Sequence, residues 1–153
     1  MCAQYNYGHR TNKPLYGKQN NKGKSKKREL DGRLRNIVNI FKEKQYEKLS
    51  DVSILDTLEH TFQRVPNSQI RGIYQRFMKI EKVKELKDKR SRLFMLYVLI
   101  KYKESRDVLK GDAPLFLSEI IKELLRFNNQ NEFNRAFKYA QNLFETIVAV
   151  AKK

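Results

Sequence analysis

The sequence predicts an all-α protein: a compact bundle of about six helices at residues 30–153, preceded by a disordered basic N-terminal arm at residues 1–29. Three observations lead to this prediction. Apolar residues recur at intervals of three and four through nearly all of the chain after residue 30. No segment has an obvious partner strand. The first 28 residues carry eight Lys and Arg, no Asp or Glu, and hardly any aliphatic side chain to bury.

The charge of the chain is strongly positive and is divided between the arm and the body. The formal net charge is +16, from 33 Lys and Arg against 17 Asp and Glu, and residues 29–153 alone keep 25 bases against the 17 acids. A basic body favours a polyanionic partner. Two interpretations of the arm stay open: a solvated linker, or an arm that binds a polyanion without specificity.

The first two helices are expected in residues 30–49 and 53–65. Residues 30–49 space their apolar side chains at helical intervals, and Asp31 is a candidate N-cap. The shorter helix that follows is expected to place three apolar residues on one side, namely Leu55, Leu58 and Phe62.

Pro66 breaks the chain, and Asn67 or Ser68 is expected to cap the next helix. That helix has one apolar stripe, formed by Ile70, Ile73, Tyr74, Phe77 and Ile80. Its opposite face holds Arg71, Gln75, Lys79 and Lys82. Because Val83 and Leu86 fall out of phase with the stripe, we expect the helix to bend or stop near residues 84–90.

The longest apolar run, LFMLYVLI at residues 93–100, is too short to cross a bilayer. Composition alone would allow a buried strand, but its continuation into a polar helical segment and the lack of partner strands favour a central, mostly buried helix. The basic stretch at residues 82–92 before it is expected around an interhelical turn.

Two further helices complete the bundle. One is expected to start at Asp112 as a cap, with Pro114 in its first turn. Residues 128–131 form a turn, and the closing helix follows. Its three phenylalanines share one apolar arc, so we interpret them as core and not as a platform for stacking on nucleic-acid bases. These residues are Phe133, Phe137 and Phe144.

No catalytic or cofactor site assembles from the sequence. There is no Gly-rich phosphate loop, no Ser–His arrangement and no zinc spacing, and His60 is the only histidine outside the arm. Asp51, Asp56 and Glu59 suggest a divalent metal, but Asp51 is also a candidate helix cap. We therefore expect a non-enzyme without cofactor or metal. The absence of a secretory signal and the single cysteine favour the cytoplasm.

Three stretches, taken in order, resemble the small subunit of type III-A CRISPR effector complexes, the Csm small-subunit family. NSQIRGIY at 67–74 is similar to the family's Ser-x-Ile/Leu-Arg helix start, and LFMLYVLIKYKESR at 93–106 resembles its apolar helix ending in an aromatic and an arginine. FNRAFKYAQNLFETIVAVAKK at 133–153 resembles its closing signature. The chain departs from the family pattern at Ser105, Thr146 and Val150, and the resemblance spans roughly residues 67–153. The type III-B small subunit is the family most easily confused with it.

The resemblance implies a non-catalytic helical subunit that self-associates in several copies along a backbone of repeated subunits carrying crRNA. Its partners would be crRNA and target RNA, the backbone subunits and the large signature subunit, with no membrane. The residues expected to face RNA are Arg71, Lys79, Arg106 and Lys138, followed by Arg35, Arg76 and Lys101. Two alternatives stay open: a stand-alone DNA-binding regulator with a helix-turn-helix at residues 65–68 and beyond, and a ribosome-associated RNA-binding protein.

Overall fold

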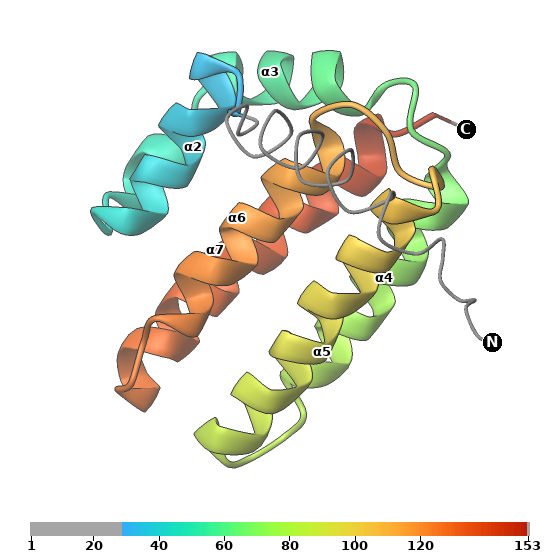
Figure 1. The fold of residues 1–153 in the computed structure, drawn as a ribbon. Coiled ribbons are helices and arrows are strands. Elements are labelled where there is room, and N and C mark those ends of the chain that lie inside the picture. The colour runs from blue at the N-terminus through green and yellow to red at the C-terminus, as the bar shows by residue number, and fades with distance from the viewer. Residues whose placement is uncertain (1–28, 153) are drawn as a thin grey trace, which may run out of the picture.

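The computed structural model describes residues 29–152; the predicted arm, apart from its last residue, lies outside the described residues. Within that range the chain forms six α-helices, one short 3-10 helix and no strand beyond a single isolated bridge. The prediction of an all-α bundle of about six helices is confirmed (Figure 1). The elements are α2 (Gly32–Lys42), η2 (Tyr46–Leu49), α3 (Val52–Phe62), α4 (Asn67–Ile80), α5 (Leu86–Ser105), α6 (Ala113–Leu125) and α7 (Gln130–Val150).

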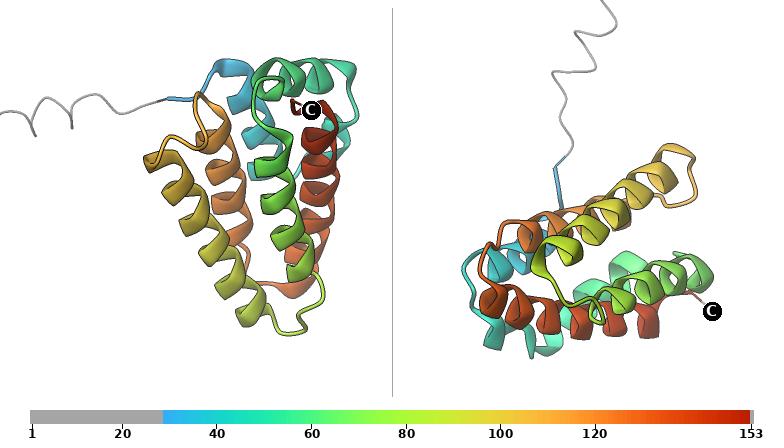
Figure 2. Two further views of the ribbon diagram at one scale, coloured as in Figure 1. Left: turned by 90° about the vertical axis from the view of Figure 1, so that its right-hand side faces the viewer. Right: turned by 90° about the horizontal axis from the view of Figure 1, so that it is seen from below.

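The helices pair in a way that leaves one side of the bundle open. Helix α5 packs chiefly on α6, whereas α4 packs on α7 and on α5. Helix α3 crosses the ends of the bundle and rests mainly on α7 (Figure 1). The two views in Figure 2 show α4 and α5 as a hairpin whose helices diverge from the turn that joins them. This divergence creates the groove that is described below.

Polar caps at the start of several helices explain where the helices begin. The Asp31 carboxylate accepts a hydrogen bond from the Arg33 amide at 2.8 Å, as the sequence predicts. Asp51 caps α3 through the Ser53 amide at 2.9 Å, and Asn129 caps α7 through the Glu132 amide at 3.0 Å. Asp51 is therefore the helix cap that the sequence offered as one of two interpretations.

The expected cap of α4 is wrong. Pro66 occupies the N-cap position without a side-chain hydrogen bond, and Asn67 is already helical. The Asn67 side-chain amide instead donates to the Val148 carbonyl of α7 at 2.8 Å. The Asn67 backbone amide donates to the Lys152 carbonyl at 2.7 Å. Contacts to the last helix and the residues after it therefore hold the start of α4.

Helix α4 ends at Ile80, earlier than the predicted 84–90. The turn that follows is held by hydrogen bonds from the backbone amides of Glu81, Lys82 and Val83, and α5 begins at Leu86. The helix ends here because Val83 is out of phase with the apolar stripe of α4. Continuing the helix would therefore bury no further apolar surface against α7.

The core is built around phenylalanines contributed by different helices. Phe77 of α4 is fully buried, and its ring stacks on Phe137 at 4.3 Å and on Phe144 at 4.4 Å between ring centroids. Phe62 of α3 meets Phe116 of α6 edge to face at 6.2 Å. All three phenylalanines of α7 are buried, so their interpretation as core is confirmed.

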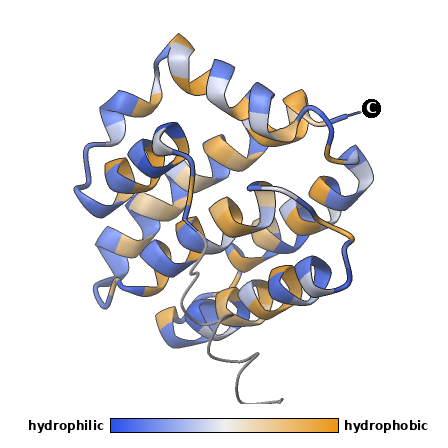
Figure 3. Cartoon of the chain, turned by 45° about the horizontal axis from the view of Figure 1, so that its top comes forward, coloured by the Kyte–Doolittle hydropathy of each residue, from blue (hydrophilic) through white to orange (hydrophobic). Residues whose placement is uncertain are grey.

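The predicted burial of residues 93–100 is wrong, and the predicted apolar side of α3 is only partly covered. Leu55 is 44% exposed, whereas its predicted neighbours Leu58 and Phe62 are fully buried. Residues 93–100 are helical but not mostly buried, because Phe94, Met95 and Val98 are exposed. Figure 3 shows hydrophobic and hydrophilic residues along each helix. In α5 hydrophobic residues occur on the exposed side as well, since α6 and α4 cover only part of its circumference.

Candidate nucleic-acid interface

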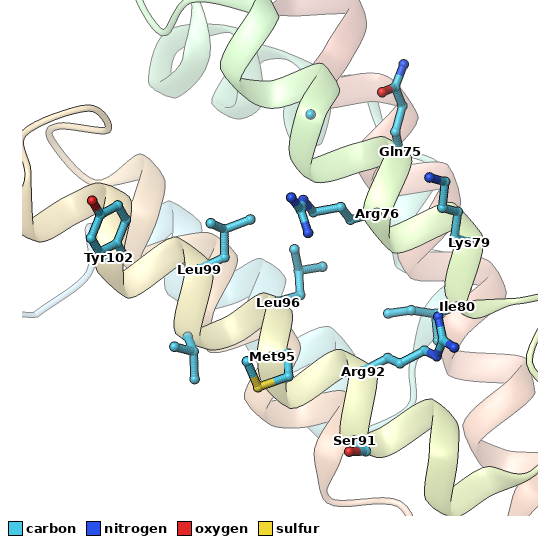
Figure 4. A pocket seen from close by; sticks show the side chains of 12 residues that line it. Gln75, Arg76, Lys79, Ile80, Ser91, Arg92, Met95, Leu96, Leu99 and Tyr102 are labelled. Carbon is cyan, nitrogen blue, oxygen red and sulfur yellow. The ribbon is translucent and has the colours of Figure 1, made fainter.

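A groove of about 860 Å³ lies between α4 and α5 (Figure 4). Helix α4 forms one side of the groove and α5 the other. The space between them opens because the two antiparallel helices diverge from the turn that connects them. Its floor is apolar, and Figure 4 shows Leu96 and Leu99 of α5 opposite α4. The residues that line it are Gly72, Gln75, Arg76, Lys79, Ile80, Ser91, Arg92, Met95, Leu96, Val98, Leu99 and Tyr102.

The charge of the groove has one sign. Arg76, Lys79 and Arg92 line it, and no Asp or Glu does. Figure 4 shows Arg76 extending from α4 toward Leu96 and Leu99, while Arg92 extends from α5 toward Ile80. Within residues 29–152, none of these three cations forms an ion pair. Because like charges line one concave surface, the groove is suited to an anionic ligand.

The outer face of α4 extends this positive surface. Arg71, Gln75, Lys79 and Lys82 are all exposed, as the periodicity predicts. Arg71 is the fifth residue of α4, just beyond the first turn in which the helix dipole acts on a cation, and that first turn holds no acidic residue. No carboxylate of the described chain forms an ion pair with Arg71.

Arg106 lies at the same end of the α4–α5 pair as Arg71. The Lys103 ammonium donates to the Gln69 side chain at 2.7 Å, which joins the last turn of α5 to the first turn of α4. The Arg106 guanidinium stands over the Tyr102 ring at 5.5 Å from its centroid. Tyr102 is 55% exposed and lines the groove, so Arg106 and an accessible aromatic ring border one end of it.

The other predicted RNA-facing residues lie apart from this surface or have partners within the chain. Arg35 of α2 forms an ion pair with Glu119 of α6 at 3.5 Å. Lys101 of α5 stands over the Tyr97 ring at 5.5 Å. Lys138 is exposed on α7. The structure thus gathers Arg71, Arg76, Lys79 and Arg106 around α4 and α5, and leaves Arg35 and Lys138 on other helices.

Sequence reasoning missed Arg92 and the exposed apolar residues beside it. The basic composition of residues 82–92 could have indicated a cation at this site. The predicted place of this stretch around an interhelical turn is confirmed: residues 82–85 lie in the turn and residues 86–92 begin α5. Which of these cations faces α4 depends on how α4 and α5 pair. The periodicity of each helix alone does not predict that pairing. Lys89 from the same stretch is buried instead, where it donates to the Asn134 side chain at 3.1 Å.

The titratable groups of the described chain bear on the expectations for a metal site and for helix caps. No group of three His, Cys, Asp or Glu residues that could hold a metal ion occurs among the described residues. The hydrogen bond from the Ser53 amide lowers the pKa of Asp51, as expected for a helix cap. Burial raises the pKa of Tyr46, whose ring stacks on Tyr139 at 4.7 Å beneath the Arg135 guanidinium. Both groups have structural partners.

Comparison of the chain with protein-family models, with curated proteins and with solved structures gives no match. The described helices include none with both the length and the apolar character needed to cross a membrane.

Proposed function

We propose that this protein is a non-catalytic, RNA-binding small subunit of a type III-A CRISPR effector complex, acting in antiviral defence in the cytoplasm. The observation that carries the RNA-binding part is the outer face of α4, where Arg71 and Lys79 are exposed and neither forms an ion pair within the described chain. The motif resemblance in residues 67–74, 93–106 and 133–153 supports the assignment to this class of complex.

The RNA contacts in this proposal are to phosphate and sugar, because base pairing with the guide supplies sequence specificity in RNA-guided systems. Arg71, Lys79 and Arg106 carry the proposal, and Lys138 is a further candidate on α7. Arg35 contributes less, since the ion pair with Glu119 already engages it. Lys101 stands over Tyr97 as Arg106 stands over Tyr102, at 5.5 Å in each case, and is a further candidate on α5. The partners are crRNA and target RNA, backbone subunits, the large signature subunit and other copies of this chain.

The main alternative, a DNA-binding regulator with a helix-turn-helix, has less support from the packing. A helix-turn-helix packs its two helices against each other and exposes the second one to the major groove. Here α3 rests mainly on α7, and the apolar stripe of α4 is buried against the bundle. The alternative of a ribosome-associated protein is separated from our proposal by the experiment below.

The test is purification of the tagged full chain from cells that carry the complete effector locus. We expect a guide RNA and the backbone subunits to co-purify. Co-sedimentation with ribosomes, or specific binding of the isolated protein to a DNA duplex, would contradict the proposal. In the assembled complex, the double charge reversal Arg71→Glu/Arg106→Glu should weaken binding of target RNA without unfolding the subunit. Equal binding by variant and wild type across salt concentrations would show that these two residues do not face RNA.

A further inference from the structure

The outer face of α3 is an exception to the positive surface of the molecule. Val52 and Leu55 are 72% and 44% exposed. Asp56 and Glu59 are also exposed, and positions 52, 55, 56 and 59 follow the spacing that places residues on one side of a helix. Helix α3 contains no Lys or Arg, although the chain has 33 of them. One helix side thus combines exposed aliphatic groups with carboxylates.

The two carboxylates have no cationic partner within the described chain. Neither Asp56 nor Glu59 takes part in any of its ion pairs. Carboxylates repel phosphate, so this side of α3 is unsuited to RNA, and its aliphatic groups are suited to a protein surface. The surface that would complement it has an apolar floor and cations that are free of ion pairs.

The α4–α5 groove has these properties. Its exposed apolar lining includes Met95, Val98 and Tyr102, and its cations are Arg76, Lys79 and Arg92. The lengths also agree. Helix α3 has 11 residues and is about 16 Å long. The groove extends along α5 from Ser91 to Tyr102, which is again about 16 Å at 1.5 Å per residue.

We propose that α3 of one copy docks in the α4–α5 groove of a second copy. Val52 and Leu55 would lie on the apolar floor, and Asp56 and Glu59 would meet the cations of Arg76 and Arg92. Each copy offers one α3 face and one groove, built from different elements, so the contact is head-to-tail and can be repeated by further copies. Self-association is part of the function proposed above, and this inference deepens it by naming the two surfaces. RNA would remain at Arg71 and Arg106, which lie outside the groove lining.

Two charge-swapped variants of the full chain test this contact. One is Asp56→Arg/Glu59→Arg, which makes α3 basic, and the other is Arg76→Glu/Arg92→Glu, which makes the groove acidic. Light scattering coupled to gel filtration, over a range of protein concentrations, gives the mass of each. We expect the wild type to associate, and each variant alone to associate at least about tenfold more weakly, because like charges then face each other.

A mixture of the two variants provides the decisive measurement. The basic α3 of the first variant then faces the acidic groove of the second. The unchanged acidic α3 of the second variant faces the unchanged basic groove of the first, so association should return. Helical content and melting temperature, measured for each variant, show whether the fold is retained. The control Lys42→Gln changes an exposed cation of α2 outside the groove lining and should leave self-association unchanged.

Three outcomes would overturn the inference: a wild type that stays monomeric at all concentrations, association that both variants retain, or a mixture in which association does not return. If the groove variant lost RNA binding while self-association was unaffected, the groove would be an RNA site and not a docking site. The proposed RNA-binding function is tested separately by the Arg71→Glu/Arg106→Glu variant, because neither residue lines the groove. The docking inference can therefore fail while the RNA-binding proposal holds, and the two sets of variants distinguish these outcomes.

Discussion

Neutralising Arg71 and Lys79 together should reduce the salt dependence of RNA binding by a predictable amount. The proposed change is Arg71→Gln/Lys79→Gln in the full chain. Both side chains are exposed on the outer face of α4, and neither has an ion pair within the described residues. Their replacement therefore removes two positive charges without breaking an observed ion pair.

The size of the effect follows from the helix geometry. Arg71 and Lys79 are eight residues apart on α4, which is about 12 Å along the helix axis. Successive phosphates of a stacked strand rise by about 3.4 Å, so the two cations reach different phosphates. Each phosphate contact on a single strand contributes about 0.7 to the slope of log K against log salt. The double variant should lose about 1.4 of that slope, and between about 50 and 200 mM salt its affinity should fall about sevenfold less than that of the wild type.

The assay is fluorescence anisotropy of a short labelled single-stranded RNA, titrated with protein at several salt concentrations. The eight cations of residues 1–28 are present in every variant, so differences in slope come from the body of the protein. The matched control is Lys42→Gln/Lys48→Gln, which removes the same charge from exposed positions on α2 and η2. A slope equal to that of the wild type for the α4 variant, or an equal decrease for the control, would refute a specific phosphate track on α4.

Three further predictions concern the fold that presents this surface. Phe77→Ala should lower the free energy of unfolding by about 3–5 kcal/mol in urea denaturation, because a fully buried ring that stacks on Phe137 and Phe144 is lost; a loss below about 1 kcal/mol would contradict the packing. Burial raises the pKa of Tyr46 above 10.0, so its contribution to stability is present below pH 10 and is lost as the pH rises through the raised pKa. Tyr46→Phe should therefore show a smaller fall in unfolding free energy above pH 10 than the wild type, and equal falls would exclude this origin. Asp31→Ala should cost about 1 kcal/mol through loss of the α2 cap, while Asp31→Asn should retain most of the stability.

The sequence alone determined the number of helices in the described part of the chain, the cap Asp31 and the buried phenylalanines of α7. These features depend on short-range information. A helix repeats every 3.6 residues, and a cap bonds to an amide two or three positions away, so both can be recognised within a window of one or two turns. The outer face of α4 was predictable for the same reason.

The tertiary structure decided which helix sides stay exposed and which cations form ion pairs within the chain. Leu55 and Met95 carry the same apolar signal as buried neighbours, but they are exposed because no other helix of the described chain covers their side of α3 or α5. Arg35 resembles the other surface cations in sequence, yet it pairs with Glu119 across two helices that are far apart in the chain. The groove between α4 and α5 likewise results from the angle at which two helices pack. Such features depend on contacts between distant segments, and these contacts are fixed only when the whole bundle packs into one arrangement.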